Sequence, residues 1–105
     1  MNRFPEEDWK LFRSKISDWQ EAYMKKLNQE YIEILSGDGY ESDKFWALEK
    51  QIREDKHDCG VHCRMSRSNL LSIMISLLNE GAITFNDLEG FSDDLKDTLR
   101  HLAGK

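Results

Sequence analysis

The chain has 105 residues and a mass of 12.4 kDa, which suits one domain with a single core. Its net charge of −5 at pH 7 argues against a protein built chiefly to hold nucleic acid or anionic lipid, because both are negatively charged. Two cysteines are too few for a disulfide framework, and the longest apolar run is far below the ~20 residues that cross a bilayer. The N-terminal segment is acidic where a secretory signal is basic. We therefore expect a soluble cytoplasmic protein whose residues 1–105 form one domain.

A long first helix is expected from about Pro5 to Leu35. Proline suits the first turn of a helix, and the acids that follow it interact favourably with the helix dipole. Apolar residues then recur every three or four positions, at Trp9, Phe12, Ile16, Trp19, Tyr23, Leu27, Tyr31 and Ile34.

This helix would measure about 45 Å, whereas a compact domain of this size has a diameter not far above about 30 Å. Either its end frays, a loop folds back over it, or a second copy covers it. Because Trp9 to Tyr23 follows coiled-coil spacing for two heptads, we predict a homo-oligomer, most simply a homodimer. The predicted interface residues are Trp9, Phe12, Ile16, Trp19 and Tyr23.

A turn over residues 36–39 separates the first helix from a second one, expected from Asp43 to about Asp58 with Ser42 as its N-cap. This second helix carries an aromatic-headed stripe on one face, formed by Phe45, Trp46, Leu48, Glu49 and Ile52. Gly60 and the apolar Val61 after it are typical of a glycine C-cap.

The segment Leu70–Leu78 is apolar on nearly every side of a helix, with only Ser72 and Ser76 as polar positions. Such a helix must be wrapped by others. We expect it to begin near Ser66 and to end before Gly81. Thr84 and Asp87 then resemble a capping box, and Ser92 can cap a last helix, while Phe85 and Phe91 should dock on the core. The predicted fold is therefore all-α, a compact bundle of four to five helices around this central helix.

The segment His57-Asp58-Cys59-Gly60-Val61-His62-Cys63 holds two imidazoles and two thiols. His57, Cys59, His62 and Cys63 are a zinc-ligand set by type, although structural zinc sites usually draw ligand pairs from two separate segments. A thiol nucleophile or a redox pair is a weaker interpretation, because the spacing is Cys-x-x-x-Cys and no orienting third group is apparent. The bland interpretation is a polar loop with incidental thiols, so we expect no cofactor and keep zinc as an alternative.

Short capped helices joined by tight turns also resemble a helix-turn-helix. The acids Glu89, Asp93, Asp94 and Asp97 would repel phosphate there, so Arg64 and Arg67 are better candidates for DNA contacts. DNA binding is kept as an alternative, although the charge of the chain does not favour nucleic acid as a partner.

Several phrases along the chain are familiar together. They are Trp19-Gln20-Glu21-Ala22-Tyr23-Met24, Lys44-Phe45-Trp46-Ala47-Leu48-Glu49, Asp55-Lys56 before Gly60-Val61, and Glu80-Gly81-Ala82-Ile83 leading to Asp87-Leu88 and Phe91-Ser92. With them the chain resembles a small uncharacterised all-helical family of Gram-positive bacteria, often mislabelled "multidrug transporter". The resemblance brings no activity or site residue, and no segment here could span a membrane as that label requires. In that family the loop before Gly-Val is not rich in Cys and His, which weakens the zinc interpretation.

The sequence thus favours a bacterial, cytoplasmic, non-enzymatic module that self-associates and acts through contacts with a protein partner it does not name. A small DNA-binding regulator and a zinc-binding module are the alternatives.

Overall fold

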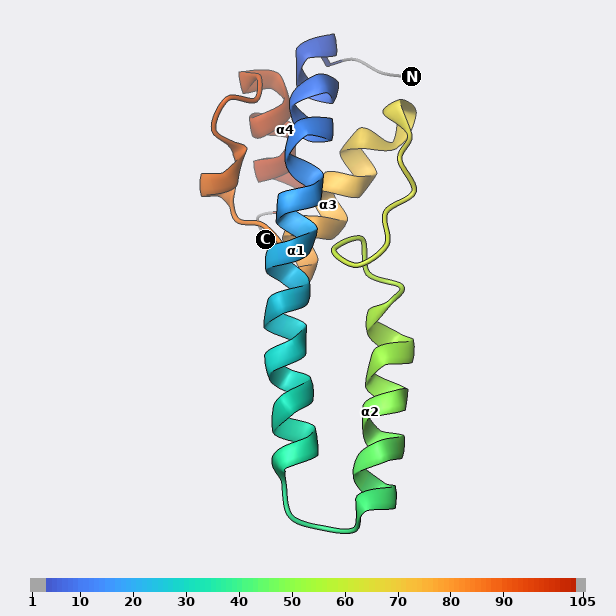
Figure 1. Ribbon diagram of the computed structural model, residues 1–105. Coiled ribbons are helices and arrows are strands. Elements are labelled where there is room, and N and C mark those ends of the chain that lie inside the picture. The colour runs from blue at the N-terminus through green and yellow to red at the C-terminus, as the bar shows by residue number, and fades with distance from the viewer. Residues whose placement is uncertain (1–3, 104–105) are drawn as a thin grey trace.

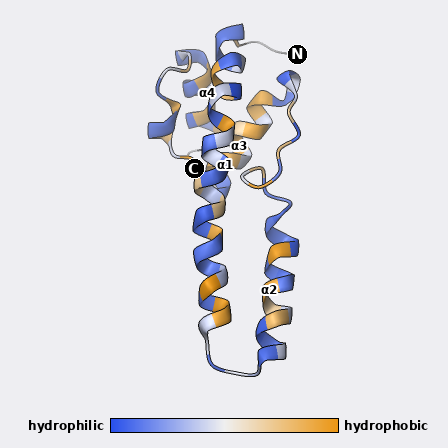
Figure 2. Cartoon of the chain, viewed as in Figure 1, coloured by the Kyte–Doolittle hydropathy of each residue, from blue (hydrophilic) through white to orange (hydrophobic). Residues whose placement is uncertain are grey.

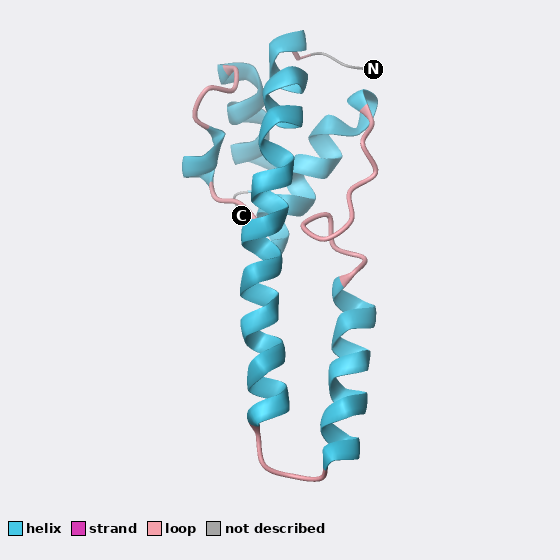
Figure 3. Cartoon of the chain, in the orientation of Figure 1, coloured by secondary structure: helices cyan, strands magenta, loops and turns pink. Residues whose placement is uncertain are grey.

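The computed structural model describes residues 4–103 and is all-helical over that range (Figures 1 and 3), which confirms the predicted fold class. Its four α-helices are α1 (Glu6–Ser36), α2 (Glu41–Asp55), α3 (Leu70–Glu80) and α4 (Asp93–Ala103). Two short 3-10 helices, η1 (Arg67–Asn69) and η2 (Phe85–Leu88), precede α3 and α4. The first helix agrees with its predicted range to within one residue at each end.

Local signals correctly placed the end of α3 and the starts of η2 and α4, whereas α3 starts at Leu70, after η1, and not near Ser66 as predicted. Gly81 ends α3 in the left-handed region with φ of 81°, a conformation that favours glycine. Thr84 and Asp87 form the predicted capping box. The Ser92 hydroxyl accepts a hydrogen bond from the backbone N–H of Leu95 at 3.2 Å and so caps α4.

The predicted ends of the second helix were wrong. α2 starts after Tyr40 rather than Ser42, and Lys56 is its C-cap in the right-handed helical region. Gly60 therefore does not end a helix. It lies four residues beyond, in the loop that joins α2 to η1.

The molecule is elongated, with principal extents of 52 × 23 × 20 Å and a radius of gyration of 16.3 Å. A compact domain of this length has a radius of gyration of about 13 Å, so the helical bundle is more elongated than predicted. Figure 1 shows the reason: α1 runs the whole length, α3, α4 and η2 surround its first half, and α2 returns alongside its second half. The second half of α1, which extends beyond the core, thus packs against α2 of the same chain.

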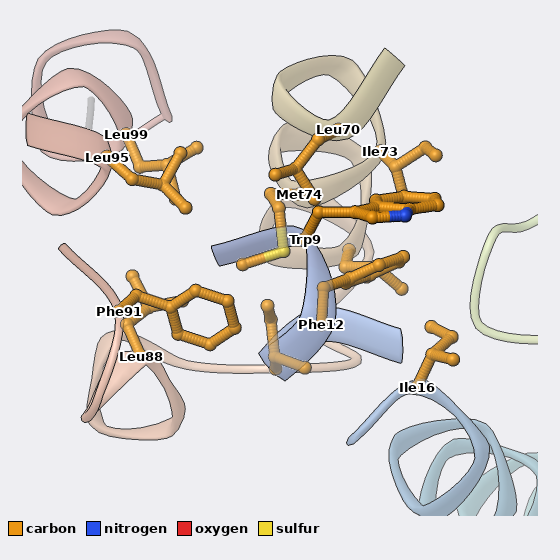
Figure 4. Close-up of a cluster of buried hydrophobic side chains, with 12 residues drawn as sticks. Trp9, Phe12, Ile16, Leu70, Ile73, Met74, Leu88, Phe91, Leu95 and Leu99 are labelled. Atoms are coloured by element: carbon orange, nitrogen blue, oxygen red, sulfur yellow. The ribbon is translucent and has the colours of Figure 1, made fainter. Parts of the chain in front are cut away.

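The hydrophobic core lies at the end of the molecule where α3 and α4 pack on α1 (Figure 4). Met74 and Leu77 of α3 are completely buried there, as a central helix requires. The wrapping of α3 is incomplete, because Leu71, Ile75 and Leu78 are half-buried at its edge. The buried members of the core are Trp9, Phe12, Ile16, Leu70, Ile73, Met74, Leu77, Ile83, Leu88, Phe91, Leu95 and Leu99. Phe91 docks as predicted, whereas the same prediction for Phe85 was wrong, since Phe85 is exposed.

A buried carboxylate joins the start of α1 to the start of α4. Asp8 accepts hydrogen bonds from the backbone N–H of Ser92 at 2.8 Å and from the Ser92 hydroxyl at 2.6 Å. The same Ser92 caps α4, so one contact between residues 84 positions apart fixes both the helix end and its place on the core.

Candidate functional site

The loop of residues 56–63, which follows α2, is held in place by side chains of α1 and α3. Gln20 donates a hydrogen bond to the backbone carbonyl of Cys59 at 3.0 Å, and the Tyr23 hydroxyl donates to the Asp58 carboxylate at 2.7 Å. From α3, the Glu80 carboxylate accepts the backbone N–H groups of Cys59 at 3.0 Å and Gly60 at 3.1 Å. The loop is therefore an ordered connection between the hairpin and the core.

The four predicted metal ligands in this loop do not converge. His57 and His62 are exposed, whereas Cys59 and Cys63 are half-buried free thiols packed against the core. Among residues 4–103, no group of three or more His, Cys, Asp or Glu side chains is placed so that it could hold a metal ion. Zinc binding therefore stays a prediction of the sequence alone.

The chemistry of the two thiols is set by their burial. Burial, followed by the charge of the neighbouring thiol, raises the pKa of Cys63 to about 11. Burial and the nearby Glu80 carboxylate also raise the pKa of Cys59. Because both pKa values are raised, both thiols are protonated near neutral pH. A nucleophile or a zinc ligand must be a thiolate, so the protonated form is the less reactive one.

The buried edge of the loop also affects Glu80. Burial raises the pKa of this carboxyl group, although the hydrogen bonds that it accepts from two backbone N–H groups lower the pKa. Glu80 thus serves as an acceptor for loop backbone at a position where its charge is partly desolvated.

The two arginines proposed for nucleic acid lie before α3 and are exposed. Arg67 is already engaged: its guanidinium donates to the Glu6 carboxylate at 2.7 Å and lies 5.8 Å from the centre of the Trp9 ring. Within residues 4–103, Arg64 has no such partner. A single engaged arginine and one exposed neighbour give no arrangement that specifies a groove or a phosphate track.

The aromatic stripe predicted as an interface between copies is covered by the chain itself. Trp9, Phe12, Ile16 and Tyr23 are buried, and the half-buried Trp19 lies 6.3 Å from Phe91, ring centre to ring centre. All but Tyr23, which is buried beside the loop at residues 56–63, pack on or within the core formed with α3 and α4. This stripe is used within one chain, so a second copy would need another surface.

A different apolar surface is open. The hairpin formed by α1 and α2 carries large exposed hydrophobic side chains, and Figure 2 shows hydrophobic segments on both of its helices away from the core. Tyr40 is 79% exposed, Phe45 61% and Trp46 62%. Ile32, Leu35 and Ile52 are exposed on the same hairpin, and we call these six residues the hairpin patch. No residue of α2 is buried.

The hairpin is held by polar contacts along a shallow apolar groove. The Tyr31 hydroxyl of α1 donates to the Asp55 carboxylate at 2.7 Å, and Gln51 donates to its other oxygen at 3.0 Å. Burial and this hydrogen bond raise the pKa of Tyr31 above its ordinary value, so the hydroxyl keeps its proton. Beside them lie two adjoining hollows of about 260 Å³ and 240 Å³, which share Ile52 and Lys56.

The sequence analysis placed Phe45 and Trp46 in one stripe of the second helix and did not identify the hairpin patch. One signal was present: Phe45 and Trp46 are adjacent, and neighbouring helical residues point about 100° apart, so they could not both face one partner helix. Their rings instead contact each other edge to face, 4.9 Å between centres. Large apolar residues on two faces of a helix indicate a second contact surface.

Comparison of the chain with protein-family models, with curated proteins and with solved structures finds no match. Within residues 4–103, no helix combines the length and the apolar character needed to cross a membrane.

Proposed function

We propose that this protein is a non-enzymatic interaction module of the bacterial cytoplasm that acts through protein contacts and self-associates by its helical hairpin. The observation that carries the proposal is the hairpin patch, six large hydrophobic side chains that are exposed on the hairpin of α1 and α2. Exposed apolar patches of this kind mark contact surfaces more often than isolated apolar residues do.

The placement of the other apolar residues supports this assignment. The core at the opposite end already buries twelve hydrophobic side chains, including two fully buried leucines of α4, Leu95 and Leu99. The hairpin patch is therefore not needed to fold that end. Because exposing large apolar side chains to water is unfavourable, the patch indicates another role. The raised pKa values of both thiols, the strongest candidate nucleophiles of the sequence, support a role without catalysis.

Multi-angle light scattering at several protein concentrations tests this proposal. The wild-type chain should rise in apparent mass with concentration, and Phe45→Ser should shift this rise to higher concentration without lowering the melting temperature, because Phe45 is 61% exposed. Leu102→Ser is the matched control, since Leu102 is 48% exposed on α4, far from the patch in sequence. A monomeric mass for the wild-type chain at every concentration would argue against self-association.

Tryptophan quenching gives a second readout in the same samples. Trp46 is 62% exposed, whereas Trp9 is 7% exposed and Trp19 is half-buried, so acrylamide should quench mainly Trp46 in the free chain. If Trp46 of the wild-type chain is protected from acrylamide at high protein concentration and Trp46 of Phe45→Ser is not, the contact lies on the hairpin.

A further inference from the structure

The two cysteine side chains of the loop after α2 lie next to each other. The backbone carbonyl of Asp58 accepts hydrogen bonds from the N–H groups of Val61 at 3.0 Å and His62 at 2.9 Å, so the chain makes one helical turn here. Cys59 lies within this turn, and Cys63 follows it directly. Residues four apart across a helical turn have Cα atoms about 6 Å apart, inside the range of roughly 4.4–6.8 Å that a disulfide spans. The backbone therefore allows a bond between the two sulfur atoms.

The hydrogen bonds around the two sulfur atoms give them different roles. The Cys59 sulfur accepts one hydrogen bond from the Cys63 thiol and another from the Ser76 hydroxyl of α3. Burial raises the pKa of Cys59, and these two donors act against that rise because they stabilise the thiolate. Burial also raises the pKa of Cys63, and its role as a donor adds to the rise. Cys59 is therefore the better nucleophile of the pair, and Cys63 is the thiol placed beside it.

The backbone of Cys59 is fixed from two sides, whereas the chain after the turn is irregular. Gln20 of α1 donates a hydrogen bond to the Cys59 carbonyl at 3.0 Å, and Glu80 of α3 accepts one from its N–H group at 3.0 Å. Residues 63–66 form neither helix nor turn and lead to η1. A movement of Cys63 toward Cys59 therefore closes the gap between the sulfurs without displacing the residue that both helices hold.

We propose that Cys59 and Cys63 form a reversible intramolecular disulfide by exchange with a low-molecular-weight disulfide. The Cys59 thiol loses its proton to water, and its sulfur attacks one sulfur of the reagent, whose S–S bond breaks and releases one thiolate. Cys63 then loses its proton and attacks the Cys59 sulfur of the mixed disulfide, which releases the second thiolate. The two protein thiols are oxidised by two electrons in total, and the reagent is reduced to two thiols.

This pair is a redox-sensitive site in the connection between the hairpin and the core. Thiols of cytosolic proteins are kept reduced, and the disulfides that do form there are usually transient or redox-sensing. In the cytoplasm proposed for this protein, the dithiol is the resting form, and the disulfide forms when oxidised low-molecular-weight thiols accumulate. The reaction involves one copy of the chain, so it does not depend on the proposed self-association.

Mass spectrometry of the wild-type chain treated with bis(2-hydroxyethyl) disulfide tests the bond. At about pH 8 the product should be about 2 Da lighter than the reduced chain, should carry no reagent, and should return to the dithiol with dithiothreitol. Peptide mapping should find the link between Cys59 and Cys63. A chain that stays unmodified, keeps a stable reagent adduct, or becomes linked to a second chain would overturn the proposal.

The variant Cys63→Ser separates the two steps. It keeps a hydroxyl donor beside Cys59 but removes the second sulfur, so the reaction should stop at a mixed disulfide on Cys59 that is about 76 Da heavier than the reduced chain. If this variant gains no adduct while the wild-type chain is oxidised, Cys59 is not the attacking sulfur, and that assignment is overturned.

The variant Ser76→Ala tests the donor from α3. Losing one hydrogen bond to a thiolate raises the thiol pKa by about one unit, which lowers the thiolate fraction about tenfold and raises its nucleophilicity about threefold. Disulfide formation should therefore be about threefold slower than in wild type. Ser72→Ala is the matched control, because Ser72 is exposed one turn earlier on the same helix and should leave the rate unchanged. Far-UV circular dichroism checks that both variants are folded, and equal rates for the two would overturn the role of Ser76.

Discussion

Gly60→Ala tests how the loop after α2 is packed against α1. A Cβ atom at this position would lie 2.3 Å from Cδ2 of the Tyr23 ring and 2.8 Å from two further ring carbons, far inside contact distance. Tyr23 cannot yield easily, because its ring is buried and its hydroxyl is bonded to Asp58 at 2.7 Å. Overpacking of this kind costs about 1–3 kcal/mol, and a ring that rotates away also loses a hydrogen bond to a carboxylate. We expect the free energy of unfolding to fall by about 3 kcal/mol.

Equilibrium urea unfolding followed by circular dichroism would measure this loss, with Gly37→Ala as the control. At Gly37 the nearest atoms to an added Cβ are at 3.7 Å and φ is −72°, so that substitution should be neutral or slightly stabilising. A double-mutant cycle with Tyr23→Ala should remove most of the Gly60→Ala penalty, because the clashing ring is gone. A penalty below about 0.5 kcal/mol, or one that persists without the ring, would refute this account of the packing.

Four further outcomes are expected. Asp8→Ala should lower the free energy of unfolding by about 3 kcal/mol, because it leaves the Ser92 donors without their buried acceptor; Glu7→Ala, exposed in the same first turn, should change it by less than about 1 kcal/mol in the same urea titration. Met74→Ala should cost about 2–5 kcal/mol, since Met74 is fully buried, and a smaller loss would mean that the α3 core is loosely packed. In the wild-type chain, alkylation of Cys63 by iodoacetamide, followed by peptide mass spectrometry, should keep accelerating about tenfold per pH unit from pH 8 to 10, because the pKa of Cys63 is raised to about 11; a rate that levels off below pH 9.5 would contradict this. Because the pKa of Glu80 is raised in the folded chain, the contribution of this group to stability is fully present below the ordinary value of 4.5 and is lost as the pH rises through the raised value. The stability of wild type relative to Glu80→Gln should therefore decrease between about pH 4 and 7. A constant or increasing difference would show that the shift has the opposite sign.

The signals that placed the helices were local ones. The regular spacing of Trp9 to Ile34, the apolar run beginning at Leu70, Gly81 and the Thr84–Asp87 box each act within a few residues, so the sequence reveals them directly. The signals failed where the contact is long-range. Gly60 was interpreted as a helix cap, but it is glycine because the ring of Tyr23, 37 positions earlier, occupies the space of a side chain. Nothing near Gly60 in the sequence carries that information.

The same limit explains the misplaced interface. Periodicity shows that Trp9, Phe12 and Ile16 share one face of a helix, but it does not show whether the covering helix belongs to the same chain or to a second copy. Here α3 and α4 of the same chain cover that face. The apolar surfaces of α3 and α4 are therefore buried against the first half of α1, and the short α2 is the helix that packs on its second half.

This division of the chain determines where an unsatisfied surface remains. Two helices that pack along one line cover one side of each other and leave the remaining sides to solvent, which is why an isolated helical pair rarely forms a core. In the hairpin, the side toward α1 is held by the Tyr31–Asp55 contact, yet Phe45 and Ile52 lie beside that line and stay open. If the hairpin had evolved only to cap a long helix, polar residues at these two positions would serve as well. Their apolar character is the feature that the proposed contact with another molecule would explain.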